Sequence, residues 1–349
     1  MSLELAAIGL MWVGLTLYAL FAGADFGGGL LDLVAGDARR GAPRRARLEH
    51  SVGPIWEANH VWLIFVLVVF WTGFPAAFAP TMATLYVPLT AAAVGIILRG
   101  SAFAMRKSTE GLTLSRLFGA LFALSSVITP FFLGTVAGAV ASGRVPADGR
   151  GDHVGSWWNP TSVFTGVLAV LVCGFLAAVY VCRDAEREGE SDLVAWFRAR
   201  ALVLAALVGV VVVSGIAVVA ADAPAVAAEL TGRGLPVVAL AVVAGCAALV
   251  LVWQGRFVAA RLAAGAAVAS VLWAWGLAQY PYLLVDQLTI EQAAGSEATL
   301  RAMVWSLGVG TVLFVPPLVW LLRATQQGQL ASSEGMETLA EQLEGDEDR

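Results

Sequence analysis

The chain has 349 residues, of which 59% are hydrophobic and only 13% are charged. That charged share is about half the share of an ordinary soluble domain, and the mean hydropathy is +0.79. The composition excludes a soluble globular protein, a disordered chain and a nucleic-acid-binding module, because a soluble surface of this size needs far more polar residues. The net charge of −5 comes from residues 334–349, which hold seven acidic residues and one basic residue.

Nine apolar runs follow one another along the chain, and each is close to the length of about 20 residues that a membrane-spanning helix needs. Nine in succession exceed any soluble core, and they lack the alternation of barrel strands. The sequence therefore predicts an all-α polytopic membrane protein of about nine transmembrane helices, arranged as two four-helix bundles plus one extra helix. The expected spans are 5–33, 56–75, 81–104, 115–141, 161–182, 201–222, 235–254, 262–281 and 302–323.

Short loops leave no room for a separate soluble domain, so residues 1–323 are expected to form one transmembrane domain. Residues 324–349 are expected to form a disordered acidic tail in the cytoplasm. Basic residues concentrate in alternate connections, and the positive-inside rule then places the N-terminus outside. The cytoplasmic connections on this interpretation carry Arg39, Arg40, Arg44, Arg45, Arg47, Arg106, Lys107, Arg116, Arg183, Arg187, Arg198, Arg200, Arg256 and Arg261.

Three charged residues lie at membrane depth, where an ionisable group is costly and invites a functional explanation. Asp25 lies late in the first span, Glu57 begins the second, and Arg99 lies late in the third. Because successive spans alternate in direction, all three fall in the cytoplasmic half of the bilayer. They could share a proton-conducting or ligand-holding pocket. Alternatively, Asp25 or Glu57 forms a structural ion pair with Arg99.

Polar and aromatic neighbours of Glu57 complete the candidate site. His60 follows Glu57 by three residues on the same helix face, so it is a further proton-transfer candidate. The candidates for a structural role or an ion pair are Arg99, Trp56, Asn59 and Trp62.

Histidine is too scarce here for a haem protein. Of the three histidines only His60 lies within an expected span, so this chain alone is expected to bind neither haem nor a metal ion. Glycines have a simpler role, because small residues let membrane helices approach closely. The first and fourth spans, the latter with Gly134 and Gly138, are the candidates for close packing. A nucleotide-binding loop has no supporting strand or Lys-Ser/Thr pair.

Several motifs occur in a fixed order in the first hundred residues. They are Gly-Ala-Asp-Phe-Gly-Gly-Gly (23–29), Gly-Pro-x-Trp-x-x-Asn-x-Val-Trp-Leu-Ile (53–64), Gly-Phe-Pro-x-x-Phe-Ala (73–79), Tyr-Val-Pro (86–88) and Arg-Gly-Ser-Ala-Phe (99–103). The set resembles subunit II of cytochrome bd-type quinol oxidases, and the resemblance extends over nearly the whole chain. That family has nine spans with the N-terminus outside.

The resemblance implies a haem-free subunit of a bacterial plasma-membrane enzyme that oxidises quinol and reduces dioxygen to water. Its partner, subunit I, carries the haems, so this chain alone is not expected to be catalytic. Acidic residues of subunit II are implicated in proton delivery from the cytoplasm. The resemblance also implies binding partners among membrane lipid, quinol and a bound quinone. It allows a small accessory subunit as a further partner. Departures are Ala22 in place of an acid, Glu57 where Asp is common, and His60 where Glu or Gln is common.

Two other functions compete with the oxidase subunit. An ion-coupled secondary transporter also uses buried carboxylates, glycine-rich spans and prolines within spans, here Pro130, Pro316 and Pro317. A structural membrane scaffold is the third interpretation. Against a transporter, nine spans do not divide into inverted repeats, and the ordered motifs favour the oxidase family.

Overall fold

The computed structural model describes residues 2–37, 39–108 and 112–326. Side chains lie outside that description at 52–58, 106–108, 112–113, 115, 314–315, 318–319 and 321–326. By internal contacts the chain divides into Met1–Ser296 and Glu297–Arg349, and each unit is described by itself. The expected boundary at residue 323 stays a prediction, because most of the acidic tail lies outside the described residues.

In the residues that the structure describes, the first unit has eleven helices and a two-stranded hairpin. Local sequence signals explain several boundaries: Ser2 caps α1, Asn159 caps α6 ahead of Pro160, and Gly189 takes a positive φ of 73° just after α6. The elements are α1 (Leu3–Leu33), α2 (Ala42–Gly73), α3 (Pro75–Thr84), α4 (Tyr86–Ser108), α5 (Leu112–Ala141), α6 (Pro160–Arg187), α7 (Ser191–Asp222), α8 (Pro224–Thr231), α9 (Leu235–Trp253), α10 (Phe257–Gln279), β1 (Tyr282–Leu284), β2 (Leu288–Thr289) and α11 (Ile290–Ala293).

The second unit contains α12 (Glu297–Gln326). In its first turn Arg301 donates to Glu297, one helical turn earlier. Two prolines, Pro316 and Pro317, lie within this helix.

Seven of the described helices are long and apolar enough to cross a membrane: α1, α4, α5, α6, α7, α9 and α10. An eighth span is reached if the end of α2 and α3 are counted together, although they meet at a bend of 119°. The bend falls where Pro75 begins a new helix, since proline cannot continue the hydrogen bonding of the preceding one. The all-α polytopic fold is therefore confirmed, whereas the count of nine spans stays a prediction.

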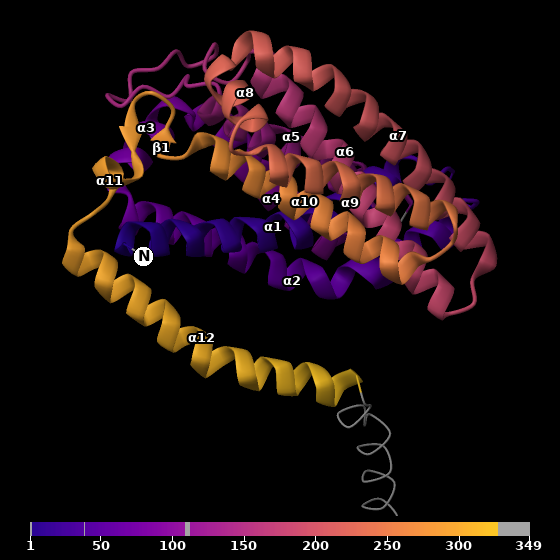
Figure 1. Cartoon of the computed structure of the whole chain (residues 1–349). Helices are drawn as coiled ribbons and strands as arrows, with labels where there is room; N and C mark the ends of the chain where they lie inside the picture. Colours follow the sequence, from indigo (N-terminus) through magenta and orange to yellow (C-terminus); the bar gives the residue numbers. More distant parts are fainter. Residues whose placement is uncertain (1, 38, 109–111, 327–349) are drawn as a thin grey trace, which may run out of the picture. The chain divides into compact units, whose positions relative to one another are not determined.

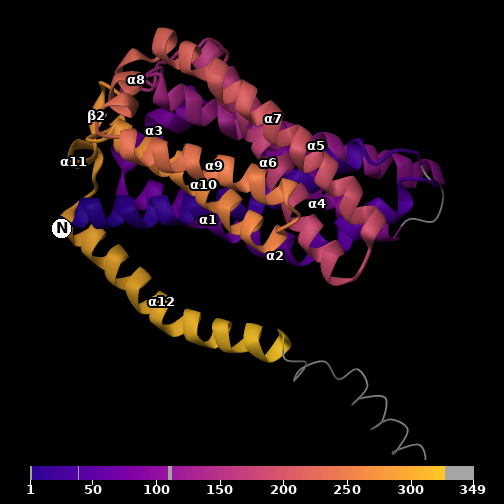
Figure 2. The same ribbon diagram turned by 45° about the vertical axis from the view of Figure 1, so that its right-hand side comes forward.

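Helix contacts group α1, α2, α4 and α5 on one side and α6, α7, α9 and α10 on the other. The groups meet through α6, which packs against both α1 and α5, and through α10 against α1. Figures 1 and 2 show these long helices running alongside one another, with α3, α8, α11 and the hairpin gathered where α1 begins. The connections from α1 to α2 and from α6 to α7 lie at the opposite end.

Glycine permits the closest of these contacts. A Cβ atom at Gly27 of α1 would lie 1.9 Å from the carbonyl oxygen of Cys173 in α6. At Gly138 of α5 a Cβ atom would lie 2.5 Å from the Cα atom of Ser162, also in α6. The prediction of close packing by the first and fourth spans is thus confirmed, and both use α6 as their neighbour.

Candidate functional site

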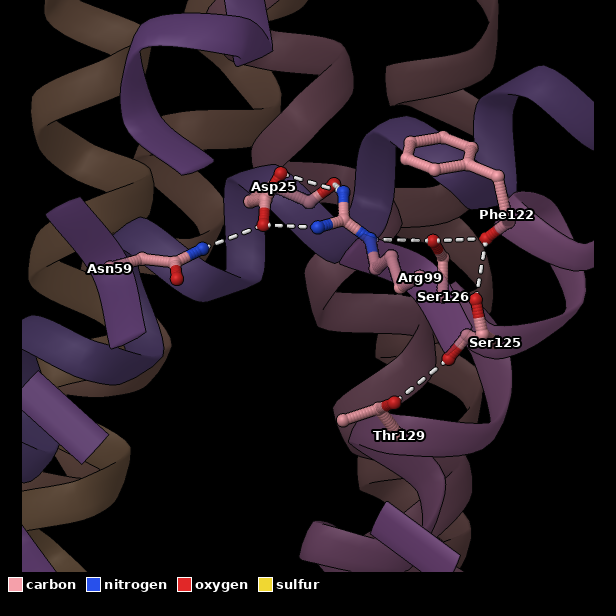
Figure 3. Close-up of polar contacts among 7 residues, drawn as sticks. All are labelled: Asp25, Asn59, Arg99, Phe122, Ser125, Ser126 and Thr129. Carbon is pink, nitrogen blue, oxygen red and sulfur yellow. Dashed lines mark hydrogen bonds and ion pairs between the residues drawn. The ribbon is translucent and has the colours of Figure 1, made fainter. Parts of the chain in front are cut away.

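A buried ion pair joins α1 to α4 and forms the centre of the candidate site. Arg99 Nη1 donates to Asp25 Oδ2 at 2.5 Å, and Arg99 Nη2 donates to Asp25 Oδ1 at 2.6 Å and to the Asp25 carbonyl oxygen at 2.9 Å (Figure 3). The side chains are 1% and 0% exposed, respectively. The guanidinium therefore binds both the carboxylate and the backbone of α1, which fixes the two helices at this depth.

Two further helices contribute one polar residue each. Asn59 of α2 donates its amide to Asp25 Oδ2 at 2.6 Å, and Arg99 Nε donates to Ser126 Oγ of α5 at 2.8 Å (Figure 3). All three nitrogens of the guanidinium are thus hydrogen-bonded. A buried pair of charges is tolerated when its remaining donors and acceptors are satisfied in this way.

Aromatic rings surround the cation where it has no polar partner. The guanidinium carbon of Arg99 lies 5.1 Å from the ring centroid of Phe26 and 4.7 Å from that of Phe122. These cation–π contacts add stability in a dry site.

Around this pair α5 approaches α1 and α4 closely, because each of these two helices has a glycine at the contact. A Cβ atom at Gly29 would lie 2.2 Å from Ser126 Oγ, and one at Gly95 would lie 2.3 Å from Thr129 Oγ1. Larger residues at either position would push α5 away from the helices that supply Asp25 and Arg99.

Three hydroxyl groups of α5 beside the pair, those of Ser125, Ser126 and Thr129, bond to the backbone of their own helix and form no chain of side-chain hydrogen bonds among the described residues. Ser126 Oγ donates to the carbonyl oxygen of Phe122, Ser125 Oγ to that of Leu121, and Thr129 Oγ1 to that of Ser125. Figure 3 shows the contacts of Ser126 and Ser125 with Phe122, and that of Thr129 with Ser125, running along α5. Since the hydroxyl protons are bonded to the helix's own backbone, proton movement past Ser126 would need water or local rearrangement.

The structure bears on each predicted site residue differently. Asp25 and Glu57 are the two carboxyl groups expected to pair with Arg99, and the structure shows the pair with Asp25. Trp56 and Glu57 lie in α2, but their side chains are outside the described residues. Their proposed roles therefore stay predictions.

His60 and Trp62 lie on the same helix, and each contacts an aromatic ring. The His60 ring centroid lies 6.4 Å from that of Phe26, and Nδ1 has no hydrogen-bond partner among the described residues. Trp62 meets Phe65 edge-on with ring centroids 6.0 Å apart.

Sequence reasoning missed Ser125, Ser126 and Thr129, and the ring contacts of Phe26 and Phe122. Serine and threonine at a spacing of three or four on an apolar run signal one polar stripe on that helix. That stripe could have placed α5 beside the charged pair. No comparable signal identifies the phenylalanines.

Networks of ion pairs hold both ends of the first unit. At the end where α1 meets α2, Arg47 Nη1 donates to Glu188 Oε1 at 2.7 Å and Nη2 to Glu190 Oε1 at 2.9 Å. The hydrogen bond from Arg47 lowers the pKa of Glu188. At the other end Arg144 binds Asp222 at 2.5 Å and 3.0 Å. These contacts join α2 to the α6–α7 connection, and the loop after α5 to the end of α7.

Among the described residues no three histidine, cysteine, aspartate or glutamate side chains gather as metal ligands would. The fold and the site together define a polytopic all-α membrane protein whose first helices enclose a buried carboxylate–guanidinium pair.

The family model described as cytochrome bd terminal oxidase subunit II matches residues 3–325, so the chain belongs to that family. The cytochrome bd ubiquinol oxidase subunit 2 of Bacillus subtilis (strain 168) is 29% identical over 154 residues. That alignment spans 43% of this chain and 44% of the relative, less than half of either protein. These matches do not favour a transporter.

A solved structure of bd oxidase from Geobacillus thermodenitrificans has the same fold. One chain of it superposes with a TM-score of 0.73 at 24% sequence identity, covering 93% of this chain and 99% of that chain.

Proposed function

We propose that this chain is the haem-free subunit II of a bd-type quinol oxidase in a bacterial plasma membrane. In this proposal it supports a haem-bearing subunit I, which oxidises quinol and reduces dioxygen to water. Family membership over residues 3–325 supports the proposal, as does the scarcity of histidine in the sequence. The chain alone would be neither haem-binding nor catalytic, although a quinone or lipid could still bind to it.

We infer further that acidic residues of the first two spans help to deliver cytoplasmic protons. The observation that carries this inference is the buried Asp25–Arg99 pair, because Asn59 links Asp25 to α2 only two residues from Glu57. Asp25 oxygens already accept hydrogen bonds from Arg99 and Asn59, and a proton taken up by Asp25 would remove the charge that attracts Arg99. Glu57 is therefore the stronger candidate for the relay, with Asp25 nearer the entrance.

The decisive experiment replaces Glu57 in the assembled oxidase. Glu57→Gln keeps the size of the side chain but cannot ionise, so we expect slower quinol-driven oxygen consumption with haem content unchanged. Glu57→Asp keeps a carboxylate and should retain much of the activity. Glu291→Gln is the matched control, because Glu291 is exposed in the short helix α11. Wild-type turnover by fully assembled Glu57→Gln would exclude the relay, and loss of assembly would indicate a structural role instead.

The partnership has a separate test in the visible absorption spectrum. The chain expressed alone should show no stoichiometric Soret band, and the complex purified through a tag on this chain should show haem absorption and quinol oxidase activity. A Soret band from the isolated chain would overturn the haem-free assignment.

We propose the orientation with the N-terminus outside and the acidic tail in the cytoplasm. Single cysteines within 34–52 should then react with an impermeant reagent only from the cytoplasmic side. Cysteines within 142–160 should react only from the opposite side.

A further inference from the structure

Two arginines contact one tryptophan ring at the end of the bundle where α6 connects to α7. The guanidinium carbon of Arg200 lies 4.0 Å from the ring centroid of Trp196, and that of Arg44 lies 4.7 Å from the same centroid. Trp196 is 8% exposed and meets Phe197 edge-on at 4.9 Å. The ring is therefore a fixed platform that brings cations from α2 and α7 together.

Three neighbouring arginines at this end have carboxylate partners. Arg45 binds Asp32, Arg47 binds Glu188 and Glu190, and Arg183 binds Glu186. These three cations are neutralised within the chain.

Arg44 and Arg200 differ from them. Arg44 Nη1 donates to the carbonyl oxygen of Ala35 at 2.7 Å, and Arg200 Nη1 donates to the carbonyl oxygen of Trp196 at 3.4 Å. Within the described part of the chain neither has a carboxylate partner. Two half-buried like charges near one ring repel each other, so an anion bound between or beside them would be strongly favoured.

The position of the pair indicates what kind of anion reaches it. Arg44 lies in the first turn of α2, ahead of the apolar part of that helix, and Trp196 lies in the second turn of α7, so both lie near helix ends. Arg44 also lines an open cavity of about 450 Å³ together with Arg40, beside the part of the site that Arg200 and Trp196 form. Glu190 and Asp192 line the same cavity, but Glu190 is engaged by Arg47.

We propose that Arg44, Arg200 and Trp196 form a binding site for the phosphate of an anionic phospholipid headgroup. Arginine binds phosphate oxygens through paired N–H donors, and basic pockets between helix ends recognise such headgroups. A soluble phosphate would offer the same oxygens. The lipid is favoured because the site lies at helix ends, where headgroups are concentrated. This proposal does not depend on the oxidase function.

The test measures lipid binding to the full chain, purified with any subunit that accompanies it. Native mass spectrometry would follow titration with phosphatidylglycerol and, separately, with phosphatidylcholine. The double variant Arg44→Gln/Arg200→Gln should bind phosphatidylglycerol about thirtyfold more weakly. This is the loss of affinity expected when two basic residues that attract anionic lipid are removed. Arg183→Gln is the matched control at the same end, because Arg183 is half-buried, as Arg44 and Arg200 are, but is already paired with Glu186.

Two further variants separate loss of the site from loss of the fold. Arg44→Lys/Arg200→Lys keeps both charges and should recover most of the binding. Trp196→Leu keeps both arginines without the platform and should weaken phosphatidylglycerol binding while phosphatidylcholine binding is unchanged.

Equal binding of phosphatidylglycerol by the wild type and the glutamine double variant, with the Arg183→Gln control also unchanged, would overturn the proposal. A second arm adds inorganic phosphate to the protein in phosphatidylcholine nanodiscs. Thermal stabilisation by millimolar phosphate that is lost in the glutamine variant, without any preference for phosphatidylglycerol, would identify a soluble anion and overturn the lipid assignment.

Discussion

The Asp25–Arg99 pair predicts a strongly non-additive response to mutation. Arg99→Met removes three hydrogen bonds to Asp25. It leaves a carboxylate that is 0% exposed and that accepts, among the described side chains, from the Asn59 amide alone. Breaking a buried pair in this way lowers the free energy of unfolding by about 3–5 kcal/mol. Asp25→Asn leaves the guanidinium in the same dry site and should cost about 3 kcal/mol.

The double variant should cost much less than the sum of the two single variants. With Asp25→Asn and Arg99→Met combined, no buried charge is left without a partner. We therefore expect a total cost near that of one single variant, which corresponds to a coupling energy of about 3 kcal/mol.

The assay is equilibrium unfolding in mixed micelles, followed by the fluorescence of the protein's 12 tryptophans. Arg301→Met is the control, because Arg301 pairs with Glu297 on an exposed helix turn and should contribute less than about 1 kcal/mol. Additive costs within about 0.5 kcal/mol would refute the reasoning, because they would show that the two buried charges do not stabilise each other.

Two other predictions concern packing and pH. Gly27→Ala places a Cβ atom 1.9 Å from the carbonyl oxygen of Cys173, so we expect the free energy of unfolding to fall by about 3 kcal/mol. At Gly9 an added Cβ atom would meet no atom within 4 Å, so Gly9→Ala should change the free energy of unfolding by less than about 1 kcal/mol. Equal effects in the same unfolding assay would contradict the close approach. Arg47 lowers the pKa of Glu188, so the stability that this pair adds is present above the ordinary value of 4.5 and is lost as the pH falls through the lowered pKa. The difference in melting temperature between the wild type and Glu188→Gln should therefore shrink between pH 7 and pH 3, and a constant difference would exclude this contact as its source.

The sequence predicts the spans better than it predicts which way each helix faces. Every one of the nine expected runs falls largely within a described helix, because a long apolar segment in lipid can satisfy its backbone only by becoming helical. The bend at Pro75 was missed, and the run expected at 81–104 therefore begins within α3. Proline marks such breaks, but the sequence does not give their angle.

The same limitation explains the outcome at the candidate site. Asp25 and Arg99 could be selected from sequence because charges are rare at membrane depth. Their neighbours could not, since a membrane helix is apolar both where it faces lipid and where it faces protein. The contacts of Asn59 and Ser126 depend on the rotation of α2 and α5 about their axes, which hydropathy leaves undetermined.

The ion pair between α1 and α4 also constrains how the protein is made. Asp25 precedes Arg99 by 74 residues, so at ordinary rates of synthesis its partner emerges from the ribosome about 4–15 s later. During that interval the first span has to enter the membrane with an unmatched carboxyl group near its C-terminal end. Arrival of α4 removes this penalty, so the third span completes the insertion of the first. A ribosome that pauses between the two would leave α1 in the membrane without this partner.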